Sequence, residues 1–270
     1  MAVIAETRTE FLVASSLDNA LVAAGAGVTK RTRRAITRLC SGGGRFVLVT
    51  TRPLRSALEL ARQAGAQTLV CSGGGVVFDP WRERLLAAKM FSVQESRRLA
   101  AILRGRLDDV RLAFDSLGGC ELDEDFRIGW ADSPGLSWSE RAEVSGPVTK
   151  VMVQSDSVPV AILAEKVRRE IASMGAVAIP APGFVDVLPV GVDHASHLRS
   201  LCRQGKASAA TTVAFGAVPA DLPLLDWSDI PVAMADADLE SMDVAGYLAG
   251  PHDEEGVAEF IERLLGKQSL

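Results

Sequence analysis

Side chains that could do chemistry follow the first apolar run of the chain. The run Phe11-Leu12-Val13-Ala14 leads into Ser15, Ser16, Leu17, Asp18 and Asn19. An apolar run of this length, bounded by turn residues, is typical of a buried parallel strand. Open α/β sheets bind ligands at the carboxyl ends of such strands. A serine hydroxyl there can act as a nucleophile when a base takes its proton. We therefore expect a functional site that begins at Ser15 and Ser16.

The surrounding pattern predicts a parallel sheet. A helical pattern over 28–40 ends at Ser41-Gly42-Gly43-Gly44, and a second buried strand, 45–49, leads into Thr50, Thr51 and Arg52. A strand, a helix and a second strand in this order imply parallel pairing through a right-handed crossover. Further strands are predicted at 68–71, 76–80, 110–114, 126–130, 148–154, 176–180, 185–189, 211–215 and 230–234, and further helices at 56–64, 81–104, 161–174, 195–202 and 254–265.

The pattern of predicted elements and the residue composition change near residue 81 and divide the chain. Alternating strands and helices lie on both sides of a block that mixes a charged helix with short strands and a Pro/Gly/Ser loop. We predict the α/β fold class: a doubly wound, Rossmannoid parallel-sheet core from 1–80 and 185–270, with an inserted α+β unit at 81–184. The strand at 185–189 is expected to return the chain to the parallel sheet.

Composition narrows the function classes. The 270 residues are 48% hydrophobic and 23% charged, with a net charge of −5, as in a globular protein. The sequence has no long run of Lys and Arg of the kind that would indicate nucleic-acid binding, and no apolar stretch reaches the ~18 residues of a membrane span. Met1 to Thr9 lacks the pattern of a secretion signal. We expect a cytoplasmic protein, a monomer or homodimer, whose partner is a small molecule. The cysteines, expected to be free thiols, are Cys40, Cys71, Cys120 and Cys202.

Five segments in order resemble the motifs of the haloacid dehalogenase (HAD) superfamily, in its Cof-like, sugar-phosphatase-like branch. They are Ser16-Leu17-Asp18-Asn19-Ala20, Val49-Thr50-Thr51-Arg52-Pro53, the turn Cys71-Ser72-Gly73-Gly74-Gly75, the loop Leu188-Pro189-Val190-Gly191-Val192-Asp193-His194, and Phe215-Gly216-Ala217-Val218-Pro219-Ala220-Asp221. The resemblance covers nearly the whole chain. It implies a HAD-like core with a large α/β cap, and places Thr50 at the phosphate-binding hydroxyl.

The same resemblance implies a degenerate active site. Where the family has a nucleophilic aspartate, a loop lysine and a magnesium-binding aspartate, this sequence has Ser16, His194 and Ala217. Mg²⁺ takes hard oxygen ligands in a strict octahedron, and mainly Asp18 and Asp221 remain to supply them. We therefore predict that Mg²⁺ binding is weak or absent, that the protein needs no cofactor, and that Mg²⁺-dependent phosphatase chemistry has been lost.

Three functions remain open. In the family's geometry, Ser16, His194 and Asp221 would converge as nucleophile, base and orienting acid, with Asp18 as the other candidate for the last role. Backbone N–H groups after Ser16 and the Thr50 hydroxyl would form an oxyanion hole. Such a site would make the protein a metal-independent hydrolase or acyl transferase. The alternatives are an inactive pseudophosphatase that binds a small molecule or a protein, and a residual phosphatase acting on a phosphorylated metabolite.

Substrate contacts are predicted from the same loops and from the cap. The candidates are Thr50, Thr51, Arg52, Leu17, Asn19, Trp130 and Trp138. Asn19 stands where the family has glycine, and asparagine tolerates left-handed backbone better than other residues with a side chain. The sequence does not define the substrate.

Overall fold

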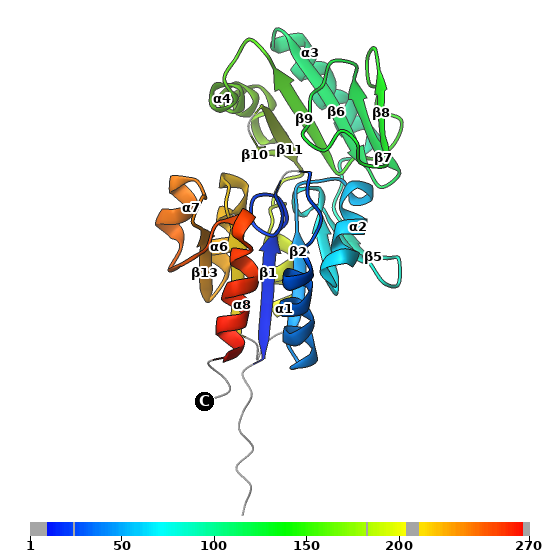
Figure 1. Cartoon of the computed structure of the whole chain (residues 1–270). Helices are drawn as coiled ribbons and strands as arrows, with labels where there is room; N and C mark the ends of the chain where they lie inside the picture. Colours follow the sequence, from blue (N-terminus) through cyan, green and yellow to red (C-terminus); the bar gives the residue numbers. More distant parts are fainter. Residues whose placement is uncertain (1–9, 24, 182, 204–210, 267–270) are drawn as a thin grey trace, which may run out of the picture.

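Two β-sheets organise the molecule, one in a core and one in a cap (Figure 1). The structure, a computed structural model, describes residues 10–23, 25–181, 183–203 and 211–266. The cap lies over the carboxyl end of strand β1, the first strand of the core (Figure 1). The prediction of an α/β core with an inserted α+β unit is confirmed.

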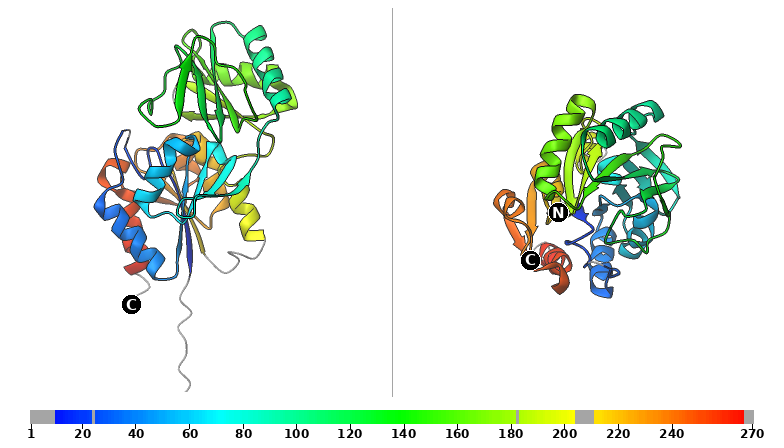
Figure 2. Two further views of the ribbon diagram at one scale, coloured as in Figure 1. Left: turned by 90° about the vertical axis from the view of Figure 1, so that its right-hand side faces the viewer. Right: turned by 90° about the horizontal axis from the view of Figure 1, so that it is seen from above.

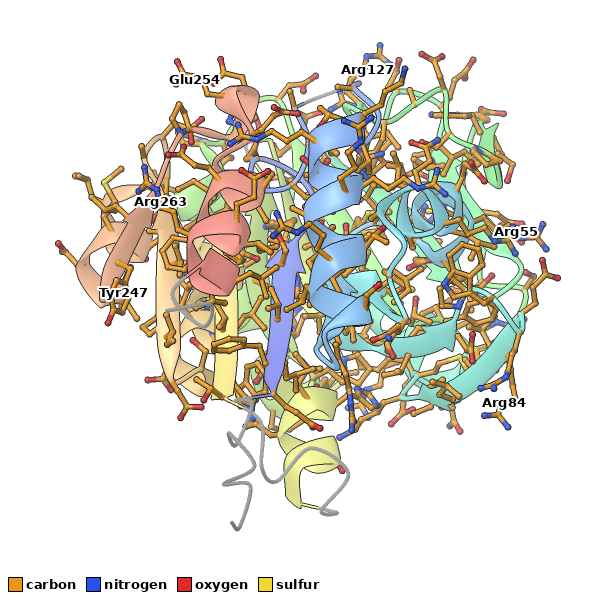
Figure 3. All side chains as sticks on the ribbon, turned by 60° about the horizontal axis from the view of Figure 1, so that its bottom comes forward. Arg55, Arg84, Arg127, Tyr247, Glu254 and Arg263 are labelled. Carbon is orange, nitrogen blue, oxygen red and sulfur yellow. The ribbon has the colours of Figure 1, made fainter. Side chains whose placement is uncertain are left out.

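The core sheet has eight strands in the order β14-β13-β12-β1-β2-β3-β4-β5. Strands β14 to β3 of this order pair in parallel, whereas β4 and β5 are antiparallel. Figure 3 shows Tyr247 of β14 and Arg84 of β5 at opposite edges of the core. The strands are β1 (Phe11–Ser16), β2 (Arg45–Val49), β3 (Thr68–Cys71), β4 (Val76–Asp79), β5 (Arg84–Ala88), β12 (Thr211–Gly216), β13 (Ile230–Met234) and β14 (Tyr247–Ala249).

Helices cover both faces of the core sheet. Helices α1 (Lys30–Ser41), α2 (Leu54–Ala64) and α8 (Gly256–Gly266) pack on one face, where Ile36 and Ile261 are fully buried. Helices α5 (Ser196–Arg203) and α6 (Leu222–Trp227) pack on the other through Leu198 and Leu224. Full burial of such a side chain contributes roughly 1.5–3 kcal/mol. Because helices cover both of their faces, the central parallel strands β1, β2, β3, β12 and β13 are rich in apolar residues, and they were predicted, whereas the exposed parallel edge strand β14 was not.

The cap sheet has six strands in the order β10-β11-β9-β6-β7-β8. Helices α3 (Val93–Arg106) and α4 (Val160–Ile171) pack against one of its faces through Leu103 and Val167. Lys150, on the other face, reaches the core, so the helix-free face turns toward it (Figure 2). The strands are β6 (Val110–Ser116), β7 (Gly119–Asp123), β8 (Leu136–Ser139), β9 (Lys150–Ser155), β10 (Ala176–Ala181) and β11 (Phe184–Leu188).

The boundaries between the two sheets differ from the predicted ones at 80/81 and 184/185. Strand β5 extends the core sheet to Ala88, because it pairs with β4. The predicted helix at 81–104 begins only at Val93, where Ser92 and Glu95 form a capping box. Strand β11 belongs to the cap and pairs antiparallel with β9 and β10, so the chain has not yet returned to the core there.

Strand β11 misled the sequence analysis because it is buried along its whole length, like a central parallel strand. The strand predicted at 126–130 is absent, since residues 126–128 have no regular structure and 129–130 form a turn. The remaining short elements are α7 (Leu239–Val244) and the 3₁₀ turns η1 (Ser72–Gly74), η2 (Ala172–Met174), η3 (Pro219–Asp221) and η4 (His252–Glu254).

Three of the four cysteines, Cys40, Cys71 and Cys120, are free thiols, and the Cys202 side chain lies outside the described part. The prediction about Met1 to Thr9 also falls on residues outside the described part. None of the helices in the described residues is both long and apolar enough to cross a membrane.

Candidate functional site

The loop after β1 holds Asp18 against a buried arginine. Arg52 Nε donates to both carboxylate oxygens of Asp18, at 2.9 and 3.2 Å, and Arg52 Nη2 donates to Oδ1 at 2.5 Å. The Arg52 side chain is 8% exposed and that of Asp18 is 34% exposed. This two-pronged pairing is the strong form of the Arg–carboxylate interaction. The Asp18 carboxylate is therefore held in an ion pair with Arg52, and the charge of Arg52 is compensated by it.

The residues around Ser16 are largely engaged in the fold. Ser16 ends β1 and is buried, and Leu17 lies in the hydrophobic core with no exposed surface rather than facing a ligand. The Leu17 N–H donates to Val49 O at 2.9 Å, and the Asn19 N–H donates to Val22 O at 3.1 Å. These two amides are therefore not free to form the predicted oxyanion hole. Asn19 has φ +58°, in the left-handed region.

The two threonines after β2 have different roles. Thr50 is buried, and its Oγ1 accepts the backbone N–H of Arg52 at 3.1 Å, which shapes the turn that places Arg52 beside Asp18. The Thr51 carbonyl accepts from Lys150 Nζ of the cap at 2.7 Å. Thr51 also lines a cleft between cap and core, described below.

His194 and Asp221 form a buried pair. His194 Nδ1 lies 2.9 Å from Asp221 Oδ1, and neither side chain is more than 3% exposed. Asp221 Oδ2 accepts the N–H groups of Ala217 and Val218 at 3.0 and 3.3 Å. Because the carboxylate can only accept, Nδ1 carries the hydrogen, and in the neutral form of the ring Nε2 is an acceptor.

His194 Nε2 has no hydrogen-bond partner among the described residues. The structure thus brings His194 and Asp221 together, but no hydrogen bond joins His194 to Ser16 in this conformation. The alternative orienting residue, Asp18, is bonded to Arg52 instead.

A glycine turn fixes the loop that carries His194. Gly74 has φ +100°, and a Cβ built on it would lie 2.0 Å from Asp193 O and 3.2 Å from His194 N. Only glycine allows this backbone approach. Asp193 Oδ1 then accepts the Ala195 N–H at 2.8 Å, and Asp193 also pairs with Arg199.

The two tryptophans predicted to touch substrate lie elsewhere in the cap. Trp130 packs against the small apolar cluster that contains Phe126 and Phe184. Trp138 is exposed, and its Nε1 donates to Phe126 O at 3.4 Å. Neither is among the residues that line the cleft.

That cleft, of about 630 Å³, lies between the cap and the core. On the cap side, residues of α4, β10 and β11 line it. On the core side, the lining comes from the loop that carries His194 and from residues next to Asp221. The lining residues are Thr51, Gly73, Ala161, Glu165, Arg168, Ala176, Val177, Ala178, Ile179, Asp186, Leu188, Gly191, Val192, Asp193, His194, Pro219, Ala220, Leu222, Pro223 and Glu240.

Three fully buried charged side chains meet on the helix-free face of the cap sheet, and the sequence analysis missed them. Lys150 Nζ donates to the carboxylate oxygens of Asp186 at 2.8 and 3.0 Å, and Asp115 pairs across the strands with Lys150. Burial raises the pKa of Asp115 to about 6 against the opposing effect of the Lys150 charge, and burial likewise raises the pKa of Asp186. Single charged residues within apolar strand runs were the signal available in the sequence.

The donor set at these loops does not fit Mg²⁺. Both oxygens of Asp18 accept from Arg52, and both oxygens of Asp221 accept from N–H donors, so a metal ion at either carboxylate would compete with these hydrogen bonds and, at Asp18, with the guanidinium charge. Mg²⁺ needs several oxygen ligands in octahedral geometry. Among the described residues, the side chains close enough to share a metal ion are Asp236, His252 and Asp253, none of which is on these loops.

A core sheet covered by helices on both faces, under a sheet-based cap and with polar loops at the junction, defines a class of capped α/β proteins. A family model for haloacid dehalogenase-like hydrolases matches residues 13–261. The chain belongs to this family, and the resemblance seen in the sequence is confirmed. No curated protein matches the chain.

Solved structures share the fold over nearly their full length. A haloacid dehalogenase-like hydrolase from Bacteroides thetaiotaomicron has a TM-score of 0.77 at 20% identity, covering 94% of this chain and 99% of that one. The HAD subclass IIB sugar phosphatase BT4131 has a TM-score of 0.78 at 16% identity, covering 95% and 99%. BT1666 from Bacteroides thetaiotaomicron, a HAD phosphatase, has a TM-score of 0.76 at 17% identity, covering 97% of each chain. At these identities the likeness concerns the fold alone.

Proposed function

We propose that this HAD-like protein has lost Mg²⁺-dependent phosphatase chemistry and binds a small metabolite in the cleft between cap and core. The observation that carries the proposal is the engagement of Asp18 by Arg52 next to a serine at the position of the family's nucleophile. A neutral serine cannot form an aspartyl-phosphate, so the phosphoryl group has no carboxylate to receive it.

The energetics of the Arg52–Asp18 pair support the loss of the metal. Separating this part-buried ion pair leaves the Arg52 charge uncompensated, at a cost below the roughly 3–5 kcal/mol of a fully buried pair. Mg²⁺ would have to meet this cost while a guanidinium remains within a few ångströms. Asp221 cannot compensate, because its oxygens already satisfy two backbone amides and His194.

Two measurements test this proposal. Release of p-nitrophenol from p-nitrophenyl phosphate should not depend on Mg²⁺, and the melting temperature should be the same with excess Mg²⁺ and with a chelator, because binding of an ion to the native state raises that temperature. The matched variant Asp236→Asn removes an acid outside the motif loops. Turnover that requires Mg²⁺, survives in Asp236→Asn and disappears in Asp18→Asn would contradict the proposal.

One observation favours a second candidate, a metal-independent hydrolase or acyl transferase. The buried His194–Asp221 pair leaves a bare acceptor nitrogen, as a general base requires. In such a reaction Nε2 takes the Ser16 proton while Ser16 Oγ bonds to an acyl carbon. The leaving group then departs with that proton, and water later releases the acyl group. The reaction requires the Ser16 and His194 loops to move closer together.

This candidate is tested with p-nitrophenyl acetate and intact-protein mass spectrometry. An acetyl adduct mapped to Ser16, absent in Ser16→Ala and retained in the control Ser137→Ala on exposed strand β8, would support it. Asp221→Asn should slow acetylation by about two orders of magnitude or more through loss of the correct tautomer. Ester hydrolysis that is unchanged in Ser16→Ala would exclude this reaction.

A further inference from the structure

The walls of the cleft are mostly apolar. On the cap side, Ala176 and Ala178 of β10 stand opposite Leu188 and Asp186 of β11. Val177 and Ile179 pack toward the cap helices, so strand alternation turns Ala176 and Ala178 to the other face. On the core side, Leu222 and Pro223 complete the wall. Such walls suit a ligand with a substantial apolar body.

Most of the cations near the cleft already have carboxylate partners, whereas Lys89, beside Gly191, donates to Val190 O at 2.6 Å. Lys150 is paired with Asp186, and Arg52, behind Thr51, is paired with Asp18. Arg168 at the rim pairs with Glu165 at 2.6 Å, although both are solvent-exposed. Among the described lining residues, therefore, no arginine or lysine is without a partner and ready to receive an anion.

Carboxylates outnumber cations among the residues that line the cleft. Its lining includes Glu165, Asp186, Asp193 and Glu240 but only one arginine, Arg168. Lys150 and Arg199 compensate Asp186 and Asp193 from just outside the lining. Glu240, on α7, is exposed, has no ion-pair partner among the described residues and places a negative charge at its side of the cleft. An anionic ligand would meet repulsion here.

His194 adds one polar requirement. It lines the cleft, it is buried, and its Nε2, which accepts in the neutral form of the ring, has no hydrogen-bond partner among the described residues. An unmet buried acceptor is costly, so a ligand that donates an O–H or N–H to it is favoured over one that offers only acceptors.

We propose that the cleft takes an uncharged or cationic, mainly apolar small molecule with a hydroxyl or amine donor, and that it excludes phosphate esters. This inference rests on the proposed function, since it names the ligand class of the same cleft. On this proposal the protein differs from a phosphatase in the ligand that it binds as well as in the reaction that it can catalyse.

Three probes with one aromatic body test the ligand class: naphthylmethanol, naphthylmethylamine and naphthyl phosphate, each titrated into the full-length protein by calorimetry. The alcohol and the amine should bind at least about tenfold more tightly than the phosphate, because the phosphate faces like charge without a counter-ion. Glu240→Gln should weaken binding of the amine and leave the alcohol unchanged. Glu124→Gln, at an exposed turn of the cap, should change neither.

Two blocking variants locate the binding. Ala178→Trp fills the cleft from β10, and Ala161→Trp fills it from the exposed start of α4, where a large side chain should not disturb folding. Circular dichroism confirms that each variant is folded. Both should abolish binding of the alcohol and the amine.

The inference is overturned if naphthyl phosphate binds as tightly as the alcohol, if none of the probes binds, or if both folded blocking variants still bind. Phosphate binding without hydrolysis would contradict only this inference. Mg²⁺-dependent hydrolysis of naphthyl phosphate would contradict the proposed loss of phosphatase chemistry, so the two failures are distinguishable.

Discussion

Asp115 is a carboxylic acid in a place where its charge is poorly supported. It is fully buried on β6, and neither carboxylate oxygen has a hydrogen-bond partner among the described residues. The Lys150 ammonium, which could neutralise it, donates instead to Asp186 and to Thr51 O. Burial therefore dominates and raises the Asp115 pKa from 3.8 to about 6.

This pKa predicts how stability changes with pH. An acid whose pKa is higher in the folded state stabilises the fold fully below its unfolded pKa, and the contribution is lost as pH rises through the folded pKa. Asp115 should thus cost up to ~3 kcal/mol between pH 4 and 7. In Asp115→Asn, the free energy of unfolding measured in urea should not show this decrease between pH 4 and 7. In Asp125→Asn, a variant at an exposed site, the decrease should remain. Identical pH profiles for wild type and Asp115→Asn would show that Asp115 is not the responsible group.

At the scale of elements, the turn from Ser72 to Gly75 sets the position of the His194 loop. Gly74 packs against the Asp193 carbonyl, so the turn after β3 and the loop after β11 are held together by backbone contact. Asp221 holds the His194 ring from a third element, η3. The orientation of one imidazole therefore depends on three segments that are distant in sequence.

Gly74→Ala should displace this loop. Gly43 provides a matched control, since it has φ +95° and a Cβ added there would contact nothing within 4 Å. Gly43→Ala should cost about 1 kcal/mol from backbone strain, and Gly74→Ala clearly more, because a clash adds to the strain. Urea unfolding measures both, and nuclear magnetic resonance of the His194 ring nitrogens should change only in Gly74→Ala. Equal costs and unchanged ring signals in both variants would mean that the contact is unimportant.

Elements with buried faces were predictable, and exposed elements were not. Strands β1, β2 and β3 read as apolar runs because helices cover both of their faces. Strand β5 is an exposed edge, so its residues carry no pattern of burial. The motif resemblance implied that His194 and Asp221 lie together, and they do. The pairings of Arg52 with Asp18 and of Lys150 with Asp186, by contrast, depend on loop shape and sheet register. Neither can be derived from the sequence of a single segment.

At the scale of the whole molecule, Lys150 connects the two domains. Its stem lies in the cap sheet, and its ammonium donates both to Asp186 of the cap and to Thr51 O of the core. The charge of one side chain thus stabilises two buried acids and the contact between cap and core.

Lys150→Met should therefore lower the free energy of unfolding by ~3–5 kcal/mol at pH 7, because it leaves buried acids without a counter-charge. The loss should be smaller at pH 5, where the Asp115 pKa of about 6 favours the neutral form of that acid. Urea unfolding at both pH values measures the effect. Lys30→Met at the exposed start of α1 is the control, and Lys150→Met combined with Asp186→Asn should recover part of the loss. A small, pH-independent effect would contradict this role.

The Lys150 contact also has a kinetic consequence. Swinging the cap away from the core must break the part-buried hydrogen bond between Lys150 Nζ and Thr51 O. Asp186 stays beside Lys150, because both lie in the cap sheet, so opening breaks one charge-assisted hydrogen bond to a carbonyl and leaves the ion pair intact. We expect a molecule bound beneath the cap to leave at the rate of cap opening. Its residence time, rather than its association rate, should then distinguish this protein from one whose cap lacks the Lys150–Thr51 hydrogen bond.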